Sequence, residues 1–130
     1  PEYTGEVDKG PDQYAGQVFL DSKGRTILIS WLPGWNYAGY RKKDIGCMSI
    51  PREIRLTDGK ITGYPVEEVQ HLAKDSDPAL IRTANGFRIK RDGRKSVVYK
   101  GEINDLKIIR DGYILEVFVN SGEEIYSVLL

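Results

Sequence analysis

The sequence has only one cysteine, Cys47, and one histidine, His71. A disulfide within the chain and a zinc site built from cysteine and histidine are therefore excluded. Cys47 stands in DIGCMSIP with no histidine and asparagine pair to activate it, so we favour a buried small apolar side chain over a nucleophile. His71, in EEVQHLAK, is expected at the surface or an interface and not as a general base. We expect no metal and no cofactor.

The sequence also lacks an excess of charge of either sign. Lysine plus arginine and aspartate plus glutamate both number 19, which gives a formal net charge of zero. Nucleic acids and anionic membranes both favour proteins with clustered positive charge. The one short basic run, YRKKD (40–44), is typical of a solvated turn. We therefore expect neither a nucleic acid nor a membrane as partner.

Long apolar runs are absent as well. No stretch approaches the ~20 residues of a transmembrane helix, and the first residues, PEYTGEVDKG, are not typical of a signal peptide. Together with the missing disulfides, this slightly favours a cytoplasmic location, which stays open because the sequence begins with proline and not methionine. The 130 residues predict one domain or slightly more.

Turn signals between apolar runs are abundant. Asp-Gly pairs occur at 58–59, 92–93 and 111–112, Ser-Gly at 121–122, and a polar turn at 21–24. Tight primed turns need positive φ angles, which glycine adopts without steric cost. The flanking segments are rich in β-branched and aromatic residues, so the sequence predicts an all-β chain of antiparallel hairpins.

Two segments show the two-residue period of strands. In SIPREIRLT, the apolar set is Ile50, Ile54 and Leu56, and the polar set is Arg52, Arg55 and Thr57. This pattern predicts a half-buried strand with one irregularity. In YILEVFVN (113–120) the odd positions are the more apolar ones. We expect that strand to be packed on its odd face and partly covered on its even face.

One short helix is predicted, over residues 65–75. Pro65 fits a first helical turn, and Glu67 and Glu68 favour its positive end. Val66, Val69 and Leu72 would share one face. The helix would link a first group of strands (1–64) to a β-sandwich-type unit (76–130).

The segment WLPGWNYAGY (31–40) carries four aromatic residues among one proline and two glycines. Pro33, Gly34 and Gly39 are not compatible with a regular strand or helix, so the segment is predicted to be a loop. Its rings could form a sugar-stacking platform, a partner surface or a plug for the core. The residues themselves leave these three interpretations open.

Several segments, in order along the chain, resemble the carboxyl-terminal part of the glycoside hydrolase family 32 β-fructosidases, which include invertases, sucrose-6-phosphate hydrolases and levanases. The matching residues are Asp12-Gln13-Tyr14-Ala15, Gly24-Arg25, Ser30-Trp31, Ile50-Pro51-Arg52-Glu53, Pro65-Val66-Glu67-Glu68-Val69 and Glu116-Val117-Phe118-Val119-Asn120-Ser121-Gly122. The resemblance implies that residues to about Gly63 correspond to the last blade of a five-bladed β-propeller. Residues from about Lys74 would correspond to the β-sandwich that follows it.

The resemblance also implies that the catalytic carboxylates are not in this chain. Retaining glycosidases need a nucleophile and an acid/base ~5–5.5 Å apart. The family's Trp-Met-Asn-Asp-Pro-Asn, Glu-Cys and Arg-Asp-Pro motifs do not occur in the sequence. The aspartates of SDP (76–78) and of the two RDG triplets (91–93 and 110–112) are interpreted as turn residues. No catalytic residue is therefore predicted.

The resemblance implies that Trp31 and Trp35 lie near a fructosyl site, because aromatic faces pack well on sugar C–H groups, and that Asp12 and Tyr14 lie near it as hydrogen-bonding residues. Three functions stay open. The chain could be a non-catalytic, structural fragment of an enzyme that hydrolyses sucrose or fructans, an autonomous carbohydrate-binding β-sandwich that uses the Trp31–Tyr40 loop, or a truncated product with an oligomerisation role. The expected partner is the missing propeller portion or a second copy.

Overall fold

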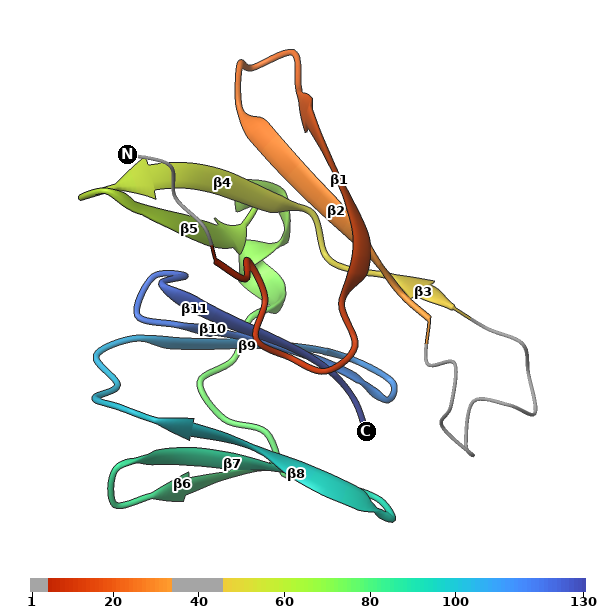
Figure 1. The fold of residues 1–130 in the computed structure, drawn as a ribbon, viewed down its shortest axis with the longest axis vertical. Helices are drawn as coiled ribbons and strands as arrows, with labels where there is room; N and C mark the ends of the chain where they lie inside the picture. Colours follow the sequence, from red (N-terminus) through yellow and green to blue (C-terminus); the bar gives the residue numbers. More distant parts are fainter. Residues whose placement is uncertain (1–4, 34–45) are drawn as a thin grey trace.

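The computed structural model describes residues 5–33 and 46–130, in which the strands form three antiparallel sheets (Figure 1). The blade sheet contains β1 (Tyr14–Leu20), β2 (Thr26–Leu32), β3 (Cys47–Met48), β4 (Arg52–Thr57) and β5 (Lys60–Pro65). The outer sheet contains β6 (Leu80–Thr83), β7 (Gly86–Arg91) and β8 (Arg94–Lys100). The middle sheet contains β9 (Leu106–Asp111), β10 (Ile114–Val119) and β11 (Glu124–Leu129). The predicted all-β class is confirmed.

The hairpins form at the predicted turns. At the β4–β5 turn, Asp58 and Gly59 have φ angles of 50° and 76°, and at the β7–β8 turn Gly93 has a φ of 61°. The β9–β10 hairpin turns at Gly112, and the β10–β11 hairpin turns over residues 120–122. Turn chemistry is local, which is why the sequence alone could predict these connections.

The middle and outer sheets pack face to face as a β-sandwich, and the blade sheet lies on the other side of the middle sheet (Figure 1). The sandwich core consists of Leu80, Phe87, Ile89, Tyr99, Leu106, Ile108, Leu115, Val117, Val119, Tyr126 and Val128. The Phe87 ring stacks on Tyr99 with centroids 5.2 Å apart and meets Tyr126 edge to face at 5.7 Å. Such aromatic contacts add to the stabilisation from buried area.

The predicted short helix is a six-residue 3₁₀ helix, η1 (Glu67–Leu72), which begins after β5 has ended at Pro65. Its expected apolar face forms only in part, because Leu72 is half exposed. No helix within the described residues is long and apolar enough to cross a membrane. The division of the chain into residues 1–64, 65–75 and 76–130 stays a prediction.

Glu68 joins η1 to the β1–β2 turn. Its carboxylate accepts hydrogen bonds from Arg25 at 2.9 Å and 3.0 Å and from Lys23 at 2.9 Å. These bonds lower the pKa of Glu68 to about 2. His71, on the same helix, is exposed, as the sequence predicted for a surface residue.

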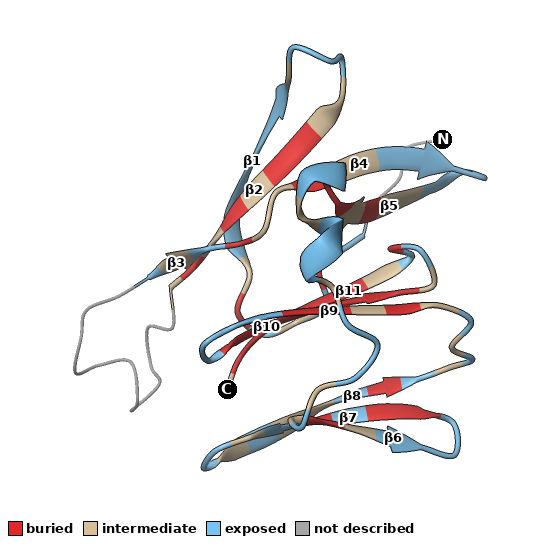
Figure 2. Cartoon of the chain, turned by 180° about the vertical axis from the view of Figure 1, so that it is seen from behind, coloured by how far each residue is buried: buried red, intermediate tan, exposed pale blue. Residues whose placement is uncertain are grey.

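Strand β10 is buried on both faces, whereas the sequence predicted an even face that is only partly covered (Figure 2). The odd residues Leu115, Val117 and Val119 point into the sandwich core. On the even face, Ile114 packs with Leu32 of the blade sheet and Glu116 is paired with Arg52. The prediction was wrong here because the blade sheet covers this face, a contact between distant parts of the chain.

The prediction of a polar and an apolar face for β4 is also wrong for two residues. Arg52, expected on the polar side, has no exposed surface, whereas Leu56 is 73% exposed. Arg52 occupies the end of β4 that lies against the middle sheet, and Leu56 lies near the far end of the β4–β5 hairpin (Figure 1). The burial of a β4 residue therefore depends more on its position along the strand than on the face from which its side chain projects.

Candidate functional site

Tyr14 and Trp31, two of the predicted sugar-binding residues, face each other across β1 and β2. Trp31 also pairs with Met48 of β3. Directly opposed residues on antiparallel strands project to the same face, so Tyr14, Trp31 and Met48 form a row across three strands. Tyr14 is 53% exposed and Met48 61%, while Trp31 is half-buried.

Gly46 lies directly against the indole of Trp31. A β-carbon built at Gly46 would be 2.7 Å from Cε2 of that ring, a distance that real contacts do not reach. The backbone thus limits how far the indole can move. Trp31 and Leu32 belong to β2, so the loop predicted over residues 31–40 was wrong at its first two residues. Trp35 and the rest of that loop from residue 34 lie outside the described residues.

Asp12 is buried and its carboxylate is directed at the sandwich. Its Oδ2 accepts a hydrogen bond of 2.7 Å from the backbone N–H of Leu129 and lies 3.4 Å from Nη2 of Arg91. These contacts hold the segment before β1 against the end of β11. A sugar-binding role for Asp12 stays a prediction, as do such roles for Tyr14, Trp31 and Trp35.

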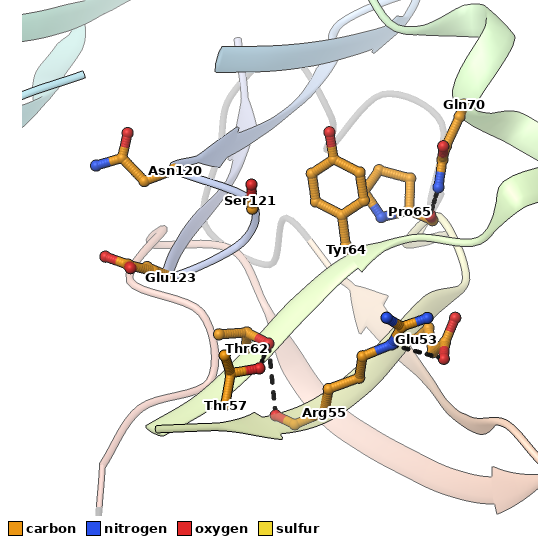
Figure 3. A pocket seen from close by; sticks show the side chains of 10 residues that line it. All are labelled: Glu53, Arg55, Thr57, Thr62, Tyr64, Pro65, Gln70, Asn120, Ser121 and Glu123. Carbon is orange, nitrogen blue, oxygen red and sulfur yellow. Dashed lines mark hydrogen bonds and ion pairs between the residues drawn. The ribbon is translucent and has the colours of Figure 1, made fainter. Parts of the chain in front are cut away.

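A polar pocket of about 320 Å³ lies between the β4–β5 hairpin and the β10–β11 turn (Figure 3). It is lined by Glu53, Arg55, Thr57, Thr62, Tyr64, Pro65, Gln70, Asn120, Ser121 and Glu123. In Figure 3 the Tyr64 ring lies between Ser121 of the β10–β11 turn and Pro65 at the end of β5. The sequence did not predict this pocket, because its two walls are about 60 residues apart in the chain.

Most polar groups of the pocket already have partners within the protein. Arg55 Nε donates to Glu53 Oε1 at 2.8 Å, and Gln70 Nε2 donates to the carbonyl oxygen of Pro65 at 2.9 Å. Burial, and then the negative charge of Asp105, raise the pKa of Tyr64, so its phenol stays a neutral donor. The pocket is thus a hydrogen-bonding surface, and none of its side chains is assigned a catalytic role.

A buried charge cluster lies where the blade sheet meets the middle sheet. Arg52 Nη1 donates to Asp8 Oδ2 at 2.8 Å, and Nη2 donates to Glu116 Oε1 at 2.7 Å and to Ser127 Oγ. The second oxygen of Glu116 accepts a hydrogen bond of 2.7 Å from the backbone N–H of Ile50. All four side chains are buried, so four segments of the chain are held together by charged hydrogen bonds.

Burial raises the pKa of Glu116, and Arg52 opposes that shift. The guanidinium also lies over the ring of Phe118, with its Cζ 5.5 Å from the centroid. The sequence did not predict that Asp8, Glu116 and Ser127 would meet Arg52. A glutamate within the otherwise apolar run ILEVFV was the available signal, because buried carboxylates are almost always paired.

Cys47 packs against the cluster of Leu32, Ile114 and Leu129. It is half-buried, whereas the sequence predicted a buried side chain. Burial, and then the charge of Asp111, raise the pKa of its thiol, which disfavours the reactive thiolate. Within residues 5–33 and 46–130, no group of three or more histidine, cysteine, aspartate or glutamate side chains could hold a metal ion.

Strand β1 is the edge of the blade sheet, and all seven of its residues are exposed. Its exposed residues include Tyr14, Val18, Phe19 and Leu20. Edge strands with exposed apolar side chains favour pairing or packing with other chains.

The fold matches part of the structures of two glycoside hydrolases. It matches the GH32 β-fructofuranosidase of Bombyx mori with a TM-score of 0.74 at 20% identity, covering 99% of this chain and 38% of that one. The sucrose-6-phosphate hydrolase of Lactobacillus gasseri matches with a TM-score of 0.71 at 19% identity, over 95% of this chain and 37% of that one.

The sequence comparisons identify the family. Residues 1–65 match the model of the glycosyl hydrolases family 32 N-terminal domain. The sucrose-6-phosphate hydrolase of Staphylococcus xylosus is 32% identical over 123 residues, which is 93% of this chain and 22% of that protein. The chain belongs to glycoside hydrolase family 32, and it spans about a fifth of the length of the curated relatives it matches.

Proposed function

We propose that this chain is the carboxyl-terminal part of a β-fructosidase and serves it as a non-catalytic, structural part. The observation that supports this proposal is the exposure of all seven residues of β1. In a complete propeller the preceding blade would cover this strand. The propeller portion would supply the catalytic carboxylates, and this chain would supply the last blade fused to its supporting sandwich.

The purified 130-residue chain is expected to release no fructose from sucrose, sucrose 6-phosphate or raffinose during a long incubation. The reason is that the sequence lacks the family's three catalytic motifs. Co-expression with a Staphylococcus xylosus sucrose-6-phosphate hydrolase truncated before the region that matches this chain is expected to give a complex that hydrolyses sucrose 6-phosphate.

A Val18→Asp/Leu20→Asp variant places charges on β1 and is expected to fold but not to co-purify with the truncated partner. Leu72→Asp is the matched control, because Leu72 is also exposed but lies on η1. Fructose release by the chain alone that an Asp or Glu substitution abolishes would refute the non-catalytic role. Self-association through β1, without binding of the truncated partner, would favour a homodimer instead.

A second candidate function is carbohydrate binding by the chain alone, and the row of Tyr14, Trp31 and Met48 favours it. Tyr14→Ala is expected to weaken binding of inulin or 1-kestose by about two- to tenfold, since one aromatic contact contributes ~0.5–1.5 kcal/mol. Tryptophan fluorescence and calorimetric titration would measure this. Tyr113→Ala is the control, because Tyr113 is also exposed but lies in the β9–β10 turn. Equal affinities for the wild type and Tyr14→Ala would contradict this function.

A further inference from the structure

The outer sheet turns one face toward the sandwich core and the other away from the molecule (Figure 1). Phe87 and Ile89 of β7 and Tyr99 of β8 point into the core. Side chains alternate along a strand, so the residues between these project outward. In the register of β7 and β8, Gly86 is opposite Lys100 and Arg88 is opposite Val98.

The outward side chains form what we call the basic face, which consists of Arg88, Lys90, Lys100 and Val98. All four are exposed, and Val98 is 52% exposed. The exposed Arg82 and Lys95 lie on the neighbouring parts of β6 and β8. Within residues 5–33 and 46–130, none of these five cations forms an ion pair or a side-chain hydrogen bond.

The charge of the chain is segregated along the sequence, although the total is zero. Residues 82–100 contain seven of the 19 lysines and arginines and only one acidic residue, Asp92, which gives an excess of six positive charges. The rest of the chain therefore contains 12 basic and 18 acidic residues, an excess of six negative charges. Arg91 and Arg94 of this segment donate to the Leu129 carbonyl oxygen and to Asp12, so the positive charge of the basic face comes from Arg88, Lys90 and Lys100. Because charges beyond about 8–10 Å are screened at physiological salt, a ligand at this face experiences mainly these three cations.

We propose that the basic face docks an extended, carboxylate-rich segment of another protein chain. Arg88 and Lys90 are two residues apart on one strand, about 6.8 Å by strand geometry. Alternate side chains of an extended acidic segment have the same repeat, so its carboxylates can meet these cations in register. The exposed Val98, opposite Arg88 on β8, offers an apolar contact beside these cations.

The composition of the face favours an acidic protein segment over other polyanions. Single-stranded nucleic acids bind on aromatic side chains that stack their bases. The aromatic residues of the outer sheet, Phe87 and Tyr99, are buried in the core. Stable membrane anchoring needs a lipid chain or a large apolar surface besides basic residues, and the basic face carries only Val98.

The test is fluorescence anisotropy of a labelled nonapeptide of alternating glutamate and threonine, titrated with the 130-residue chain at low ionic strength. We expect saturable binding that weakens as salt is raised. Arg88→Glu/Lys90→Glu is expected to weaken binding by about tenfold, because two attractive contacts become repulsive. Lys60→Glu/Lys74→Glu changes the net charge equally at exposed sites off the outer sheet and is expected to bind as the wild type does.

Several outcomes would overturn the proposal. Equal weakening by both variants would mean that the peptide responds only to net charge. Absence of binding at low salt would refute the docking surface itself. Tighter binding of a single-stranded oligonucleotide or of phosphatidylserine vesicles than of the peptide would refute the protein segment as occupant. Circular dichroism of the variants, expected to match the wild type, separates these outcomes from loss of fold.

Discussion

Replacing Arg52 with methionine is expected to lower the free energy of unfolding by about 3–5 kcal/mol, the cost of removing one partner from a buried ion pair. Methionine approximates the aliphatic stem of arginine, so packing changes little. The change leaves the carboxylates of Asp8 and Glu116 buried without their cation. Urea unfolding followed by circular dichroism would measure the loss.

Arg55→Met is the matched control, because Arg55 lies on the same strand, pairs with Glu53 and is 69% exposed at its side chain. Exposed pairs contribute only about 0–1 kcal/mol, so this variant is expected to stay close to the wild type. An Arg52→Met variant as stable as Arg55→Met would show that the cluster contributes no net stability.

The loss in Arg52→Met is expected to depend on pH. Burial already raises the pKa of Glu116 above its ordinary 4.5, and without Arg52 an opposing attraction is lost. The folded variant then binds a proton more readily than the unfolded chain, so its stability falls as the pH rises through this range. The difference from the wild type should be smaller at about pH 4 than at about pH 7. A difference that grows on acidification would contradict this assignment.

Gly122→Ala is expected to lower the free energy of unfolding by about 2–5 kcal/mol, from the strain of a left-handed residue together with overpacking. Gly122 has a φ of 85°, and an added β-carbon would lie 2.6 Å from the carbonyl carbon of Gly63. The backbone N–H of Gly63 donates to the Gly122 carbonyl at 3.0 Å. The substitution would therefore force β5 away from the β10–β11 turn.

Gly59→Ala is the control for Gly122→Ala, since Gly59 has a φ of 76° and nothing within 4 Å of an added β-carbon. It is expected to cost only the left-handed strain, about 1–2 kcal/mol. Thermal or urea unfolding of both variants would separate strain from the close approach of the two backbones. Equal losses would mean that the contact between Gly122 and Gly63 adds nothing beyond strain.

The Arg52 and Gly122 variants both test the contact between the blade sheet and the middle sheet. Arg52 and Gly122 both lie where the blade sheet meets the middle sheet, one through side chains and one through backbone. If this contact sets the position of the blade, either variant should also reduce co-purification with a truncated relative, even at temperatures where the chain stays folded.

The sequence by itself determined the hairpins, because Asp-Gly turns and alternating strands depend only on neighbouring residues. It also determined the family, through motifs such as Ile50-Pro51-Arg52-Glu53. The position of the short helix after β5 followed from Pro65 and the adjacent glutamates. Its 3₁₀ form and the exposure of Leu72 did not, since they depend on what η1 packs against.

Only the tertiary structure decided which charges are buried and which gather on a surface. Arg52 and Arg55 are three residues apart on one strand, yet one is fully buried and the other is exposed. The difference arises because Asp8, Glu116 and Ser127 converge on Arg52 from distant segments. In the same way, Lys100 joins Arg88 and Lys90 only through strand pairing. The physical reason is that burial and charge clustering depend on sheet register and layer packing, which bring together residues that are far apart in sequence.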